Sequence, residues 1–134
     1  MPFKLLFLCY LLSLTPKLIA QPLNCGDVKA PWISLTSGNL TLNAHSEPAQ
    51  IKTSETFNLI LSVCNNNQPY IGTLKFDARM PQHKHGMNYQ PRVINQNDGH
   101  YLIQGNLLHM PGLWRFSFTL DSLKQPLFFH YELP

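Results

Sequence analysis

Strict alternation of apolar and polar residues is the feature that most restricts the fold of this chain. The clearest stretch, residues 114–120, reads WRFSFTL, and every second residue in it is apolar. The same period of two runs through residues 57–63, 74–80 and 127–133. Successive side chains of a β-strand point to opposite faces, so this period is typical of strands with one buried face. The sequence therefore predicts four strands, and no window shows a convincing helical period of 3.6.

Weaker forms of the same pattern and the turns between them predict the fold class. Further candidate strands are residues 40–44, 49–53, 92–95 and 100–108, while residues 21–37 are expected to be mostly an irregular lead-in. Turn-forming sequences such as NNNQPYIG, NQNDG and DSLKQP separate the candidates. Seven or eight short antiparallel strands in a chain of this length predict an all-β, immunoglobulin-like β-sandwich. A small barrel is the alternative.

The N-terminal residues 1–20 have the composition of a secretory signal peptide. Lys4 precedes an apolar run from Leu5 to Leu14, and Ala20 is a small residue suited to cleavage. The run is shorter than the ~20 residues that a membrane-spanning helix needs. We therefore expect no lasting membrane anchor, and a soluble, periplasmic domain over residues 21–134.

Charge and cysteine usage after this cleavage restrict the function further. The mature chain would hold eight Lys and Arg residues against seven Asp and Glu. Without a basic stripe to neutralise phosphates, nucleic-acid binding is not expected. Cys25 and Cys64 remain once Cys9 is removed, and an even number in an oxidising compartment predicts one structural disulfide. A cysteine-based metal or redox site is less favoured, because neither cysteine has a CxxC partner or a nearby histidine.

Candidate ligands are concentrated in ARMPQHKHGMNYQP, residues 78–91. This stretch holds His83, His85 and Met87, spaced two residues apart. In an extended segment, such spacing points all three side chains to the same face.

A second histidine-bearing segment, LHMPGLW, follows at residues 108–114. Pro111 and Gly112 suit the two central positions of a type II turn, which require a fixed φ and a positive φ respectively. Such a turn would hold His109 and Met110 at a rigid hairpin.

The predicted strand count brings these two segments to the same end of the sandwich. Consecutive antiparallel strands reverse direction, so every second connection lies at one end. By this count the loop 81–91 shares an end with His109 and Met110, whereas Cys64 and His100 lie at the opposite end.

Imidazole nitrogen and thioether sulfur together favour copper over magnesium, calcium or manganese. We expect copper, as Cu(I) or Cu(II), to bind a site that includes His83, His85, Met87 and His109, with Met80 and Met110 as further candidates. Zinc is the main rival metal, but methionine is a poor zinc ligand. In the plainest alternative the histidines are merely solvated and Met80 belongs to the core. His45, His100 and His130 are interpreted as surface or edge residues.

Enzymatic interpretations have little support in the sequence. No GxSxG motif precedes a helix, and no carboxylate pair lies close to the histidines. We therefore expect a protein that is not an enzyme. A further alternative is a metal-free interaction module, which would dock a partner through Met87, Tyr89 and Leu113.

The motif MPQHKHGMNYQP, followed by GHYLIQGNLLHMPGLWRFSFTL, resembles the YtkA-like and FixH-like group of secreted bacterial immunoglobulin-like domains. The resemblance covers residues 73–121. It implies a periplasmic or cell-surface β-sandwich that binds copper or helps to deliver it to a copper-dependent enzyme, with that enzyme or a metallochaperone as partner. The matching positions are His83, His85, Met87 and His109. FixH-like members are usually membrane-anchored, so the lack of a lasting anchor here favours a soluble carrier.

Overall fold

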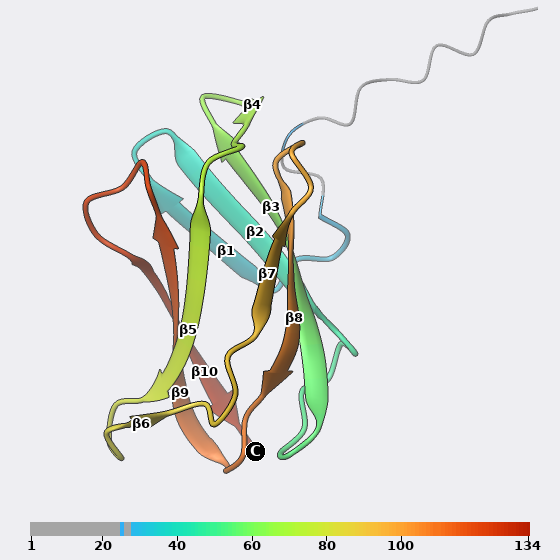
Figure 1. Ribbon diagram of the computed structural model, residues 1–134, viewed down its shortest axis with the longest axis vertical. Coiled ribbons are helices and arrows are strands. Elements are labelled where there is room, and N and C mark those ends of the chain that lie inside the picture. The colour runs from blue at the N-terminus through green and yellow to red at the C-terminus, as the bar shows by residue number, and fades with distance from the viewer. Residues whose placement is uncertain (1–24, 26–27) are drawn as a thin grey trace, which may run out of the picture.

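The computed structural model describes Cys25 and residues 28–134, which form two antiparallel sheets (Figure 1). The predicted signal peptide lies outside the described residues. The strands are β1 (Ile33–Ser37), β2 (Leu40–Glu47), β3 (Thr56–Asn65), β4 (Gln68–Pro69), β5 (Leu74–Met80), β6 (His85–Gly86), β7 (Arg92–Asn95), β8 (His100–Leu107), β9 (Gly112–Leu120) and β10 (Leu127–Leu133).

The two sheets pack face to face as a sandwich. One sheet has the strand order β1-β2-β3-β8-β7, with β4 paired to β3, and the other has the order β10-β9-β5-β6. No helix occurs among the described residues, and therefore none there is long and apolar enough to cross a membrane. The predicted all-β, immunoglobulin-like sandwich is confirmed, with ten strands rather than seven or eight because β4 and β6 have two residues each.

The core comes from the alternation seen in the sequence. In β9 the side chains of Trp114, Phe116 and Phe118 are fully buried, while Arg115 and Ser117 between them are half-buried on the outer face. Burying a large apolar side chain contributes roughly 1.5–3 kcal/mol. A strand with this pattern is therefore stable only with its apolar face against the opposite sheet.

One prediction about the N-terminal half is wrong, and another holds only in part. Residues 49–53 form no strand, and the segment is a loop between β2 and β3 in which Ile51 alone is buried. Conversely, part of the lead-in forms β1, which pairs with β2 from Ile33 opposite Ala44 onwards. Only the Ile33 end of β1 is buried, so the hydrogen bonds of the neighbouring strand, rather than a periodic pattern, define it.

The two ends of the sandwich carry different chemistry. In Figure 1, β4 lies at the upper end, while β6 and the β8–β9 connection lie at the lower end. The predicted disulfide is present, with the Cα atoms of Cys25 and Cys64 5.7 Å apart. Cys64 pairs with Pro69 of β4, so the disulfide lies at the upper end.

Candidate metal centre

Three imidazole rings lie next to one another at the lower end. The centroid of the His85 ring is 5.1 Å from that of His109 and 5.8 Å from that of His83. Two imidazoles bound to one ion have centroids at most about 6.4 Å apart, because metal–nitrogen bonds are about 2.0–2.1 Å long. Both spacings are within this limit, so the ring of His85 is close enough to share an ion with either His83 or His109.

A tight turn between β5 and β6 positions His85. The backbone N–H groups of His83 and Lys84 lie 3.2 and 3.0 Å from the carbonyl oxygen of Met80 and donate to it. His85 is then the direct cross-strand partner of Met80. Directly opposed residues of an antiparallel pair extend to the same face. The side chains of His85 and Met80 are therefore neighbours.

The extended conformation predicted for residues 83–87 is wrong. Lys84 has a φ of 54°, in the left-handed region, and residues 81–84 form the turn itself. Turn geometry, rather than the period of two, brings the ring of His83 beside that of His85. Met87 follows β6, and its N–H donates to the carbonyl oxygen of Ala78 at 3.2 Å.

The ring of Trp114 lies beneath two of the histidines. Its centroid is 5.5 Å from that of His109 and 6.4 Å from that of His85, edge to face in both cases. The indole is fully buried, and its Nε1–H donates to the carbonyl oxygen of Met110 at 3.0 Å. This bond spans the hairpin that bears His109. The contact of Trp114 with the histidines was not predicted from the sequence, although its place at the end of HMPGLW was the available signal.

Gly112 has two reasons to lack a side chain. Its φ of 121° is positive, as the predicted type II turn requires at this position. The chain bends at Met110 and Pro111, and Gly112 is the first residue of β9. In addition, a Cβ atom at this position would lie 2.9 Å from the Cε atom of Met80. Met80 therefore lies directly against the hairpin that carries His109.

Two buried nitrogen atoms in this cluster have no protein partner. The Nδ1 atoms of His85 and His109 are inaccessible to solvent and form no hydrogen bond within the part of the chain that the structure describes. Nδ1 of His45 is also unpaired, but the Nε2 atom of that ring lies 3.6 Å from Glu47. A buried polar atom without a partner costs roughly 1–3 kcal/mol. A bound ligand at His85 and His109 would remove this cost.

The other candidate ligands differ in their surroundings. Met80 is 1% exposed and belongs to the core cluster, whereas Met87 and Met110 are partly buried against it. Among the described residues, no three His, Cys, Asp or Glu side chains are grouped so that they could hold an ion by themselves. The ring contacts are pairwise, so a complete site built on His85 and His109 would need a donor of another type.

The remaining histidines lie elsewhere, and of the three predicted to be surface or edge residues His130 fits that prediction, whereas His45 and His100 are half-buried in interior strands. His100 is at the upper end with Nδ1 3.2 Å from a carboxylate oxygen of Asp98, and His130 is exposed on β10. His45 lies in β2 of the other sheet.

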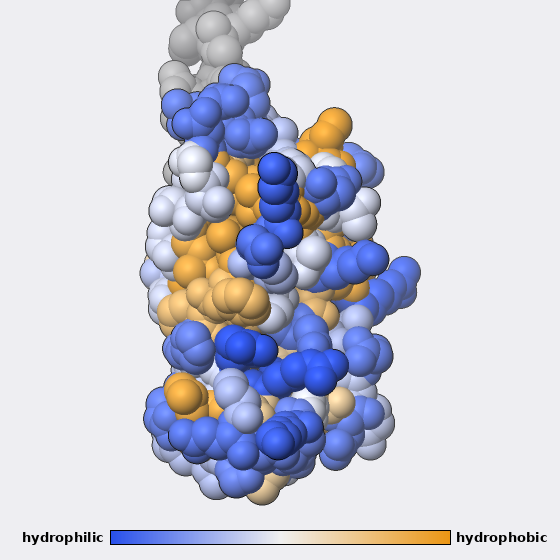
Figure 2. Space-filling model, turned by 90° about the vertical axis from the view of Figure 1, so that its left-hand side faces the viewer, coloured by the Kyte–Doolittle hydropathy of each residue, from blue (hydrophilic) through white to orange (hydrophobic). Residues whose placement is uncertain are grey.

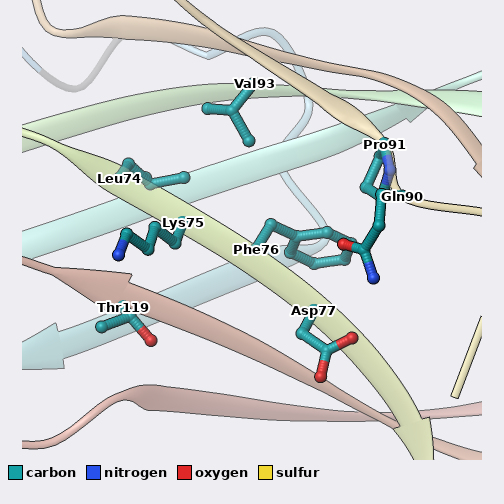
Figure 3. A pocket seen from close by; sticks show the side chains of 8 residues that line it. All are labelled: Leu74, Lys75, Phe76, Asp77, Gln90, Pro91, Val93 and Thr119. Atoms are coloured by element: carbon teal, nitrogen blue, oxygen red, sulfur yellow. The ribbon is translucent and has the colours of Figure 1, made fainter.

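A pocket of about 440 Å³ lies away from the histidines, along the outer edge of β5. Figure 3 shows Phe76 beside Gln90 and Pro91, with Lys75 and Thr119 further along. Its carboxylate, Asp77, lies 2.7 Å from the guanidinium of Arg79 in an ion pair. No histidine or methionine lines this pocket.

The outer surface near the centre is polar. Figure 2 shows hydrophilic residues predominating at the lower end of the face turned to the viewer, with an apolar band above them. His83 and Lys84 are exposed in the turn, whereas His85 is half-buried. The cluster thus runs from solvent at His83 to the core at Trp114.

No protein-family model, curated protein or solved structure matches this chain. The resemblance to the YtkA-like and FixH-like group therefore remains a prediction made from the two motifs.

Proposed function

We propose that this protein binds copper at the lower end of the sandwich and carries it. The observation that supports the proposal is the contact between the His85 and His109 rings, each with a buried Nδ1 atom that has no partner among the residues that the structure describes. These residues come from two separate segments, and the fold brings them together at a cost in stability. Metal binding at these two nitrogen atoms would compensate for that cost.

A graded site suits transport rather than catalysis. His83 is exposed and lies beside the half-buried His85, so an incoming ion would meet an accessible imidazole first. Exchange with another protein requires an accessible, incompletely closed site. We therefore propose an exported, periplasmic carrier that receives copper from a metallochaperone or delivers it to a copper-dependent enzyme, without catalysing a reaction itself.

Titration of the purified protein with Cu(I) and Cu(II), followed by calorimetry, tests this proposal. We expect one ion to bind with a dissociation constant below roughly 1 µM. The His85→Ala and His109→Ala variants should each lose most of this affinity. His130→Ala, which removes an exposed imidazole on β10, is the matched control and should bind as the wild type does. Wild-type binding weaker than micromolar for both oxidation states would refute the proposal.

The second candidate function is a metal-free interaction module. Tyr89 favours it, because this side chain is 65% exposed in the loop that carries the histidines. The double variant His83→Ala/His85→Ala distinguishes the two functions. It should abolish copper uptake if the first is correct, and it should leave partner binding intact if the second is correct.

Zinc remains the alternative metal. Thioether sulfur favours copper, since zinc prefers imidazole, thiolate and carboxylate. In a competition titration, excess Zn(II) should fail to displace Cu(I) from the protein. Displacement at comparable concentrations would instead indicate a zinc-binding protein.

A further inference from the structure

We infer that the ion carried is Cu(I), and that the sulfur of Met80 completes a set of three donors with His85 and His109. This inference rests on the proposed function and deepens it, because it specifies the oxidation state and the third donor. It also replaces Met87 as the methionine that matters most.

The backbone register places Met80 next to both histidine-bearing segments. Met80 is the cross-strand partner of His85, so the two side chains share a face of the β5–β6 pair. The terminal methyl group of Met80 lies against Gly112, at the end of the hairpin that begins with His109. The thioether therefore lies between the two strand ends that supply the imidazoles.

Burial separates Met80 from the other methionines. Met80 is 1% exposed, and Trp114, the ring beneath both histidines, is fully buried. Met87 and Met110 are only partly buried, and the carbonyl oxygen of Met110 already accepts a bond from Trp114. The donor that is most shielded from water is thus also the one opposite His85.

Charge favours a monovalent ion at this position. Two imidazoles and a thioether are neutral, so the ion keeps its full charge in a poorly solvated site. The solvation cost of burying an ion rises with the square of its charge, so a monovalent ion pays about a quarter of the cost of a divalent ion of similar size.

The residues that adjoin Met80 and Trp114 in the chain include two arginines, and a nearby positive charge repels a divalent ion more strongly than a monovalent one. Arg79 and Arg115 are cross-strand partners on the outer face of the β5–β9 pair. Arg79 precedes Met80 in the chain, and Arg115 follows Trp114. The nearest acid in the chain, Asp77, is already paired with Arg79. Soft thioether sulfur also selects Cu(I) over Cu(II) and zinc.

Competition for Cu(I) with a chromophoric chelator tests this inference on three variants. Met80→Leu keeps the volume of the side chain and removes the sulfur, while Met87→Leu and Met110→Leu are the matched controls. We expect Met80→Leu to weaken Cu(I) binding by at least about tenfold. The controls should change it by less than about threefold. Zn(II) affinity should be the same in all three variants, since the imidazoles are retained.

Selenium X-ray absorption gives a second test that does not depend on the folding of Met80→Leu. In the selenomethionine form of the Met87→Leu/Met110→Leu variant, Met80 is the only labelled residue after Met1. A copper neighbour in the selenium spectrum on loading with Cu(I) is the expected result. Its absence would overturn the inference.

The outcomes separate this inference from the proposed function. If Met80→Leu behaves like its controls while His85→Ala and His109→Ala still lose copper, the copper site stands and Met80 is not a ligand. Binding of Cu(II) more tightly than Cu(I) would overturn the assignment of the oxidation state alone. If the wild type binds neither ion, both proposals fail.

Discussion

The upper and lower ends of the sandwich differ in whether their buried side chains find hydrogen-bond partners within the protein. At the upper end, the Tyr70 hydroxyl donates to the Asp121 carboxylate, which also accepts the N–H of Thr73 at 3.0 Å. The Tyr101 hydroxyl donates to the carbonyl oxygen of Gly72 at 2.7 Å. At the lower end, the Nδ1 atoms of two histidines have no partner among the described residues. The comparison indicates that the hydrogen bonds of the upper end contribute stability, whereas the unpaired nitrogen atoms of the lower end cost stability.

The ionisable groups of the upper end reflect this network. Burial raises the pKa of Tyr101 to about 12. Burial, and next the hydrogen bond to Asp121, also raise the pKa of Tyr70. The same hydrogen bond, followed by the Thr73 N–H, lowers the pKa of Asp121 below its ordinary value. The folded state therefore favours a neutral tyrosine pair beside an ionised carboxylate.

The largest effect that tests the comparison comes from removing the disulfide. Replacing Cys25 and Cys64 by serine frees residues separated by 39 positions, and loop-closure entropy predicts a loss of about 4 kcal/mol of unfolding free energy. Urea denaturation measures this loss. Cu(I) affinity should be unchanged under conditions where the variant is folded. A parallel loss of copper affinity would show that the two ends are coupled.

Tyr101→Phe tests the upper end at high pH. The variant loses the bond to Gly72 and should be less stable by roughly 1–2 kcal/mol near neutral pH. Because the folded protein holds the Tyr101 proton more tightly than the unfolded chain, wild-type stability falls as the pH rises from about 10 towards 12. The variant should lose less stability over this range. Tyr89→Phe, at an exposed tyrosine, is the control and should follow the wild-type curve.

Asp121→Asn tests the same end at low pH. A lowered pKa means that the carboxylate stabilises the fold above its ordinary pKa of 3.8, and this contribution disappears as the pH falls through the folded-state value. The variant should be less stable than the wild type at neutral pH, and the difference should shrink in acid. Thermal melting at pH values from 7 to about 2 measures it. A difference that stays constant with pH would contradict a role for the charge.

The smallest effect is expected at the lower end. His85→Leu exchanges a buried, unpaired nitrogen for an apolar side chain, so the metal-free variant should be within about 1 kcal/mol of the wild type, or slightly more stable. Copper binding should nevertheless be lost. Urea denaturation in the presence of a chelator measures the stability. A loss above about 2 kcal/mol would show that this imidazole is structural, and the contrast between the ends would fail.

Much of the fold could be predicted because it depends on a local pattern. The strands at residues 74–80 and 127–133 are observed with the same bounds, and Cys25 pairs with Cys64 as expected. The site could be predicted only in part. Counting strand reversals placed His85 and His109 at one end, but it gave no distance. The two-residue spacing of His83, His85 and Met87 wrongly predicted an extended segment, because a turn with a positive φ at Lys84 leaves no periodic signal.

The alternation of apolar and polar residues was enough to determine that this chain is all-β with one buried face on each main strand, which favoured a two-sheet sandwich and left a small barrel as the alternative. Which polar atoms are left without partners was decided by the tertiary structure alone. That outcome depends on register, on Met80 lying opposite His85 and against Gly112, and on Trp114 closing the core beneath two imidazoles. The contacts of Met80 with Gly112 and of His85 with Trp114 join residues about 30 positions apart, and distances across such separations follow from packing rather than from any local pattern.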